Sequence, residues 1–204
     1  LKLMHTMTKF IYIFLFVLTV PVIFNIDYIL HLWLGNVVPD HAANFVILVI
    51  ITNFMNNLNA PLSNVVYETG KMRNYEVTFS VINLLIIPIS FIVLKLGAPA
   101  EMAFIVYLVM TVFVQIGCLL VIQTLTKISL SDYFMSLIVP IVIVACITLP
   151  LIYIINFYLQ QNLIGIVIEY IVITLLSSVL FYYVVLDSTE KIFVNNIIYK
   201  LKKR

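Results

Sequence analysis

Charged side chains are scarce in this chain of 204 residues. Asp, Glu, Lys and Arg make up 10% of it, whereas a soluble domain carries about 25%, and 64% of the residues are hydrophobic. A soluble fold of this size cannot bury so much apolar surface, and its exterior needs many more charges. The composition therefore excludes a soluble enzyme, a nucleic-acid-binding domain and a disordered tail.

Catalytic motifs are lacking too. The sequence has no Gly-rich phosphate loop, no Gly-x-Ser-x-Gly elbow and no His-Glu-x-x-His, so we predict no enzyme, no metal site and no cofactor. The 2 cysteines, Cys118 and Cys146, lie in apolar runs without disulfide or metal-ligand spacing, and we expect both to be packing residues. The longest external loop, about residues 35–41, holds no Lys or Arg, which weighs against a membrane glycosyl-polymerising enzyme.

Long apolar runs are what the sequence does contain. A helix needs about 20 mostly apolar residues to cross a bilayer, and the alternating polarity of a membrane β-barrel is absent. We therefore expect an all-α polytopic membrane protein with six transmembrane helices. The predicted spans are residues 10–34, 42–67, 75–96, 102–125, 133–159 and 163–186.

The basic residues predict the orientation of these spans. All but one of the 11 lysines and arginines fall before the first span, in the even-numbered connections or after the sixth span. The exception is Lys95, at the end of the third span. Because Lys and Arg favour the cytoplasmic side, both ends of this segment are expected in the cytoplasm. The first residue is Leu1 rather than Met, from which we expect a piece of a longer protein.

The second span carries an unusual number of polar residues. At 100° per residue, Asn53, Asn56, Asn57, Ser63 and Asn64 fall on one arc of the helix. Asparagines in lipid are costly, so this arc is expected to face either a cavity that takes hydroxyl-rich or hydrated cargo, or neighbouring helices as polar packing. Pro61 allows a bend in the same span.

Two acids lie within predicted spans, Asp27 in the first and Glu169 in the sixth. Each is a candidate for loading and releasing a proton or a sodium ion, because burial raises the pKa of a carboxyl group. The alternative is an ordinary hydrated residue near the headgroups. Glu68 and Glu76 flank Lys71 and Arg73 in a predicted turn, where we expect local ion pairs.

Residues 187–204 form a basic cytoplasmic tail. Five apolar residues have helical spacing there and precede a basic end, which is typical of an interfacial helix on anionic lipid. A plain stop-transfer tail is the alternative. The apolar residues are Ile192, Phe193, Ile197, Ile198 and Leu201, and the basic ones are Lys200, Lys202, Lys203 and Arg204.

Three segments in order resemble the polysaccharide and O-antigen flippases of the multidrug/oligosaccharidyl-lipid/polysaccharide exporter superfamily. Residues 29–35, read ILHLWLG and followed by Pro39, are similar to that family's "iL-lWLG…P" segment. Residues 68–75, read ETGKMRNY, are similar to its cytoplasmic "tGk-(basic)-Y" turn, and residues 88–99, read PISFIVLKLGAP, to its "PiSy-lLklG-p" span end.

The resemblance implies a two-lobe transporter of 12–14 helices, of which this chain would be most of the C-terminal lobe and the N-terminal lobe a missing partner. It implies a flippase in the bacterial inner membrane that moves undecaprenyl-pyrophosphate-linked oligosaccharide by alternating access for lipopolysaccharide or capsule biosynthesis. Membrane lipids are the other expected partner and nucleic acid is not. Coupling to H+ or Na+ is common in the superfamily, so a cation-coupled multidrug exporter of the same fold is the alternative.

The sequence departs from this family in one respect. Cavities in the family often hold basic residues that receive the pyrophosphate, whereas no Lys or Arg lies mid-span here. Lys71 and Arg73, at the expected cytoplasmic mouth, are therefore the phosphate candidates within this chain.

Overall fold

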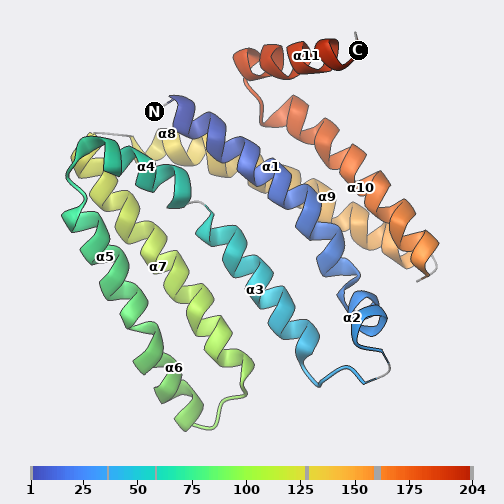
Figure 1. Ribbon diagram of the computed structural model, residues 1–204, viewed down its shortest axis with the longest axis horizontal. Coiled ribbons are helices and arrows are strands. Elements are labelled where there is room, and N and C mark those ends of the chain that lie inside the picture. The colour runs from blue at the N-terminus through green and yellow to red at the C-terminus, as the bar shows by residue number, and fades with distance from the viewer. Residues whose placement is uncertain (1, 36, 58, 127–128, 159–161, 203–204) are drawn as a thin grey trace. The chain divides into compact units, whose positions relative to one another are not determined.

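The computed structural model describes residues 2–35, 37–57, 59–126, 129–158 and 162–202, and these ranges contain helices joined by short turns (Figure 1). Six helical stretches are long and apolar enough to cross a membrane. The predicted all-α polytopic fold is thereby confirmed. The stretches are Met4–Phe24, Ala42–Thr69, Arg73–Lys95, Glu101–Leu125, Phe134–Tyr158 and Leu163–Val184.

The described chain divides into two compact units. The first unit holds α2 (Ile26–Leu34), α3 (Ala42–Asn56), α4 (Asn59–Thr69), α5 (Arg73–Leu84), α6 (Ile86–Lys95), α7 (Glu101–Thr126) and α8 (Leu130–Tyr133). The second unit holds α1 (Lys2–Phe24), the π-helical turn η1 (Phe134–Ile138), α9 (Val139–Tyr158), α10 (Leu163–Val184) and α11 (Ser188–Lys202).

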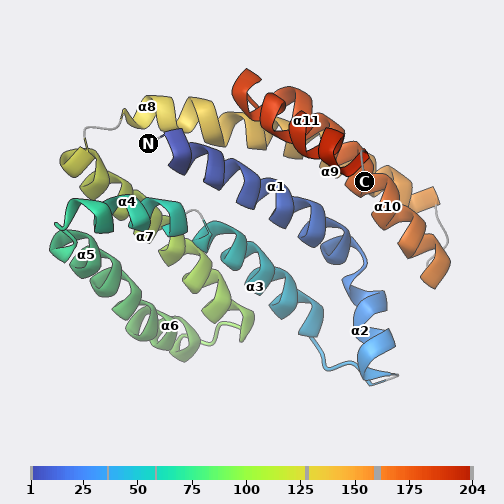
Figure 2. The same cartoon turned by 45° about the horizontal axis from the view of Figure 1, so that its top comes forward.

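Helix α7 is the centre of the first unit. It packs against α3, α4, α5 and α6, and Figure 2 shows α5 and α6 running alongside it. Met110, Val114, Cys118 and Ile122 recur at intervals of four and are buried, as expected for one stripe of a helix. At the end where α7 begins, Nδ1 of His41 lies 2.5 Å from Oε1 of Glu101 and ties the start of α3 to α7.

The α5–α6 stretch lies on the outside of its unit. None of the residues in its most apolar window is buried, and Ile87 and Phe91 are 70% and 65% exposed. Such large apolar side chains are stable against lipid rather than water. The opposite side of α5 buries Tyr75 at its first turn.

Prolines explain three helix interruptions. Pro61 has no N–H for the carbonyl of Asn57, and α3 ends at Asn56. Pro88 likewise has no N–H for the carbonyl of Leu84. Helix α5 ends at Leu84, and α6 then continues the same span. Pro140 follows the π-helical turn η1 by two residues. In a membrane such breaks persist because neighbouring groups satisfy the freed carbonyls.

Helices α9 and α10 form the hairpin of the second unit, and α1 packs against both. Their buried residues recur every three or four positions on each helix, so the two helices meet along a single seam. The seam consists of Ile141, Val144, Thr148 and Ile152 on α9, and Gly165, Glu169, Ile173, Ser177 and Phe181 on α10. The Phe181 ring also meets Phe16 of α1 edge to face, with centroids 5.3 Å apart.

Three details differ from the sequence predictions. Residues 10–34 are not one helix: Asn25 leaves the helical conformation, with φ −112° and ψ 19°, and separates α1 from α2. Asn favours such breaks because its side chain competes for backbone hydrogen bonds. Helix α1 also begins at Lys2, so Lys9 lies within it. Cys118 is buried as predicted, but Cys146 is exposed because it lies away from the seam of α9.

Gly117 of α7 provides a test of this packing. A Cβ atom there would lie 2.9 Å from Cγ2 of Thr78 and 3.1 Å from Cδ1 of Ile82, both on α5. Gly117→Leu should lower the free energy of unfolding by about 1–3 kcal/mol through overpacking, measured by thermal unfolding in detergent. Leu120→Ala on the exposed side of α7 is the control and should have a much smaller effect. Equal effects would contradict the α5–α7 contact.

Candidate functional site

The polar segment of the second predicted span consists of the end of α3 and all of α4. Leu62 and Val66, one turn apart on α4, are fully buried, and α4 packs against α7. This apolar side positions the segment. Asn53 and Asn64 are exposed, and Ser63 is half-buried. The polar residues therefore lie mainly away from the apolar packing.

The asparagines serve different purposes. Nδ2 of Asn56 donates to the Tyr107 hydroxyl of α7 at 3.1 Å, which is the polar packing between helices that was the alternative to a cavity. Nδ2 of Asn57 donates to the backbone carbonyl of Asn53 at 2.7 Å, next to the interruption at Pro61. On α3 and α4, Asn53 and Asn64 are exposed. We call Asn53, Asn57, Ser63, Asn64 and Tyr67 the polar strip.

The helix break corrects the single arc of the sequence analysis. That arc assumed an uninterrupted helix across residues 52–67, whereas α3 ends at Asn56 and α4 begins at Asn59. A constant 100° per residue cannot be carried across such a break. Asn56 lies before the break, and its contact with Tyr107 places it on the packed side of α3, beside α7.

Lys71 lies in the turn between α4 and α5, Arg73 is the first residue of α5, and both are exposed. The hydroxyl of Tyr67 donates to Oε1 of Glu76 at 2.9 Å across this turn. The expected local ion pairs are not formed: across the described ranges, no ion pair joins Lys71 or Arg73 to Glu68 or Glu76. The two cations thus remain available at the end of α4.

The two candidate coupling acids have contrasting surroundings. Asp27 is exposed in the first turn of α2, where the helix dipole stabilises a negative charge. Glu169 of α10 is only 2% exposed. Nδ2 of Asn156 on α9 donates to its Oε2 at 3.2 Å and lies 3.4 Å from its Oε1. Glu169 is therefore held inside the α9–α10 seam by an amide.

An open apolar groove of about 530 Å³ runs along the other side of the same hairpin. Its lining is entirely aliphatic apart from backbone, so hydrocarbon chains fit it better than water or headgroups. The lining residues are Ile147, Leu151, Val172, Leu175, Leu176, Val179 and Leu180.

Sequence reasoning missed several partners. Asn156 and Tyr107 were not singled out, although a polar residue within an apolar span is itself a signal. Lys9 was interpreted only as an orientation signal, but it is 2% exposed and contacts Asp187 and Glu190 at 3.0 and 3.2 Å. No periodicity could have paired residues about 180 positions apart.

Comparison of the chain with models of known families, with curated proteins and with solved structures produced no match. The geometry described above therefore carries the functional argument.

The Glu169–Asn156 pair makes a direct prediction. Asn156→Leu should lower the free energy of unfolding by about 1–3 kcal/mol, because it removes an amide donor from a buried carboxylate. Asn156→Leu with Glu169→Leu should recover much of that loss, which a double-mutant cycle of thermal unfolding in detergent measures. Leu175→Ala on the exposed side of α10 is the control. Strictly additive effects would contradict the pairing.

Proposed function

We propose that this chain is part of a flippase that moves undecaprenyl-pyrophosphate-linked oligosaccharide across the bacterial inner membrane. The observation that carries the proposal is the polar strip. It lies within a helical stretch apolar enough to cross a membrane, yet Asn53 and Asn64 are exposed rather than packed. The three resemblances to flippase segments support the same function.

Exposed asparagine amides are costly in lipid. An amide without a hydrogen-bond partner in hydrocarbon costs several kcal/mol, so exposed asparagines at membrane depth require water, polar cargo or protein beside them. Asparagine offers two donors and one acceptor oxygen, and sugar hydroxyls also donate and accept. The polar strip thus matches a glycan that is passing through a hydrated path.

Two basic residues lie just beyond the end of α4. Lys71 and Arg73 follow the polar strip directly and are exposed, and neither joins an ion pair among the described residues. Arg binds phosphate oxygens in a bidentate manner, and Lys binds them as a point charge. In the orientation predicted from the loop charges, these residues lie where a cytoplasmic pyrophosphate would first arrive.

A cation-coupled multidrug exporter is the second candidate, and one observation favours it. Glu169 lies within a membrane-length helix and is almost fully buried against an amide. An acid so placed is a functional candidate by default. In a flippase the same group would couple glycan movement to an H+ or Na+ gradient.

The test is complementation of a flippase-deficient bacterial strain by the gene that encodes the chain. Asn53→Leu with Asn64→Leu should reduce surface polysaccharide roughly thirtyfold, because two hydrogen bonds to cargo contribute about 1 kcal/mol each and 1.4 kcal/mol is about a factor of ten. Ile87→Ala with Phe91→Ala, on the lipid-facing side of α6, is the matched control and should leave it unchanged. Protein levels in the membrane are measured for every variant.

Two results would separate the candidates. An unchanged level of surface polysaccharide with the Asn53/Asn64 variant would show that the polar strip does not line the transport path. Failure of the unaltered gene to complement, together with drug resistance that is lost in Glu169→Gln, would replace the flippase by the multidrug exporter.

A further inference from the structure

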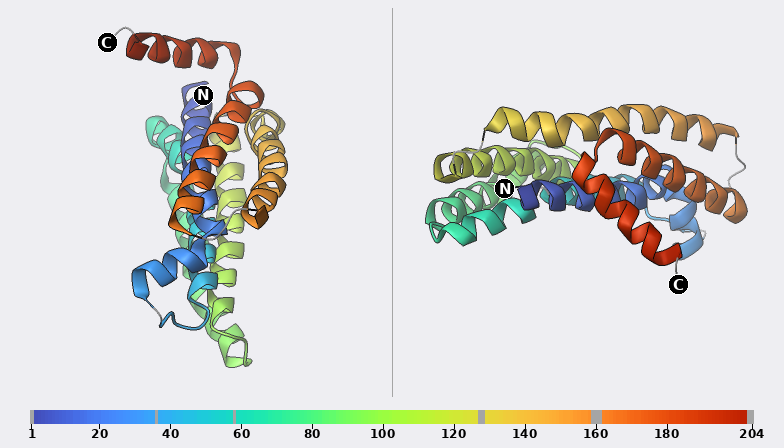
Figure 3. Two further views of the ribbon diagram at one scale, coloured as in Figure 1. Left: turned by 90° about the vertical axis from the view of Figure 1, so that its right-hand side faces the viewer. Right: turned by 90° about the horizontal axis from the view of Figure 1, so that it is seen from above.

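Helix α11 runs across the end of the second unit instead of continuing α10. Three residues separate it from the end of α10, and Figure 3 shows it lying crosswise to α10 and α1. A helix that extended α10 would leave the membrane surface. A crosswise helix at the end of two membrane-length helices lies along that surface.

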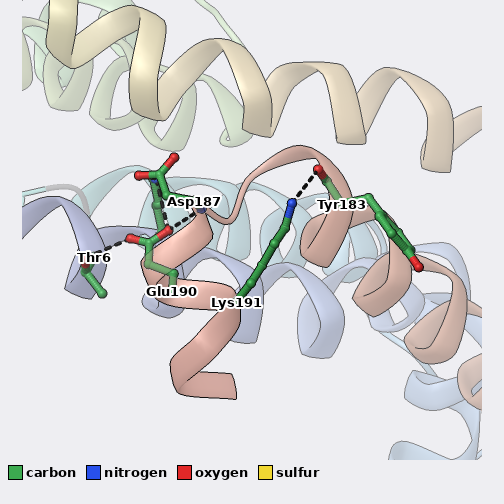
Figure 4. A network of polar contacts seen from close by, with 6 residues as sticks. Thr6, Tyr183, Asp187, Glu190 and Lys191 are labelled. Atoms are coloured by element: carbon green, nitrogen blue, oxygen red, sulfur yellow. Dashed lines mark hydrogen bonds and ion pairs between the residues drawn. The ribbon is translucent and has the colours of Figure 1, made fainter. Parts of the chain in front are cut away.

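Contacts with α1 fix one side of α11. Nζ of Lys9 lies 3.0 Å from Oδ2 of Asp187 and 3.2 Å from Oε2 of Glu190. The hydroxyl of Thr6 donates to Oε1 of Glu190 at 2.7 Å (Figure 4). Glu190 also accepts the Asp187 backbone N–H at 2.8 Å, which is the Glu half of a capping box. One buried carboxylate thus starts α11 and attaches it to α1.

Contacts with the end of α10 fix the other side. Lys191 donates to the carbonyl of Tyr183 at 3.3 Å (Figure 4) and lies 5.6 Å from the centre of the Tyr182 ring. Nδ2 of Asn195 donates to the Tyr182 hydroxyl at 3.0 Å. With anchors on two helices, the direction of α11 is set by the protein itself.

The periodicity of α11 defines two sides. By helical periodicity of the sequence, residues 190, 193, 194, 197, 198 and 201 share the side that begins at Glu190, and the last five are Phe, Val, Ile, Ile and Leu. Ser188, Asn195, Asn196 and Tyr199 lie on the opposite side, and all four are exposed. Ile192 also falls there, so it does not belong to the apolar side that the sequence analysis described. Lys200, Lys202, Lys203 and Arg204 follow in the sequence.

We propose that α11 is a preset membrane-surface helix that binds anionic phospholipid headgroups. Glu190 turns its side of α11 toward the first turns of α1, and we expect the same side further along α11 to meet the bilayer beside the unit. Four basic residues within five positions match a negatively charged leaflet, where each contributes about 1 kcal/mol. This inference does not depend on the proposed transport function.

Charge and composition favour a lipid surface over a protein partner. Beyond Phe193, whose ring meets Phe10 of α1 with centroids 6.3 Å apart, the apolar side is aliphatic in sequence, whereas protein interfaces are enriched in aromatic anchors at their centres. Lys residues are depleted from protein interfaces but are characteristic of interfacial membrane helices.

The experiment uses the full chain in lipid nanodiscs, with Cys118→Ala and Cys146→Ser as background. Spin labels are attached singly through Ile197→Cys, Leu201→Cys, Asn196→Cys and Tyr199→Cys. In nanodiscs of phosphatidylglycerol, labels at 197 and 201 should be accessible to oxygen, and labels at 196 and 199 to a water-soluble nickel chelate. Lys200→Gln with Lys202→Gln should lower the ratio of α11 docked on the lipid surface to α11 away from it by roughly 25-fold, because the two lost charges each contribute about fivefold.

Neutral phosphatidylcholine nanodiscs should reproduce that loss without any substitution. Lys95→Gln, on the far side of the predicted topology, is the matched control and should leave the ratio unchanged. Nickel accessibility at all four positions would overturn the proposal, because α11 would then lie in water. Labels at 197 and 201 that neither reagent reaches would also overturn it, since a protein partner would then cover that side.

Discussion

The constraint on which the rest of this structure depends is that hydrocarbon offers no hydrogen bonds. Every polar group at membrane depth must therefore find its partner inside the protein or face a hydrated path. Several groups meet this requirement locally: buried hydroxyls such as those of Thr52 and Thr148 donate to carbonyls one turn back, and Asn57 does the same for Asn53 beside a proline break.

The same constraint distinguishes structural from functional polar residues. Asn56 and Glu169 have defined partners on neighbouring helices, Tyr107 and Asn156, and so contribute to packing. Asn53 and Asn64 are exposed in a membrane-length stretch. Packing therefore accounts for Asn56 and gives Glu169 a structural partner, while exposure makes the polar strip the feature that needs a transport path to explain it.

The number and type of the helices could be predicted from the sequence, because a run of about 20 apolar residues has few alternatives in a membrane. Gly70 and Gly97, both with positive φ, end helices where turn residues were expected. The break at Asn25 could not be predicted, since one weak helix former inside an apolar run usually stays helical.

The site was only partly predictable. The polar run in the second span was visible in composition, but the role of each asparagine depends on which side of the Pro61 break it follows and on what α7 places opposite. The burial of Lys9 depends on carboxylates from the other end of the chain. Such long-range pairs follow from tertiary packing and leave no local pattern.

Solvent accessibility of the polar strip tests the central claim most directly. Single cysteines at positions 53 and 64, in the background free of Cys118 and Cys146, would be exposed to a membrane-impermeant maleimide in intact cells and in inverted vesicles. A hydrated path predicts labelling of both from at least one side, while a cysteine at Ile87, on the lipid-facing side of α6, stays unreacted. If positions 53 and 64 were as unreactive as position 87 from both sides, the polar strip would not line a transport path.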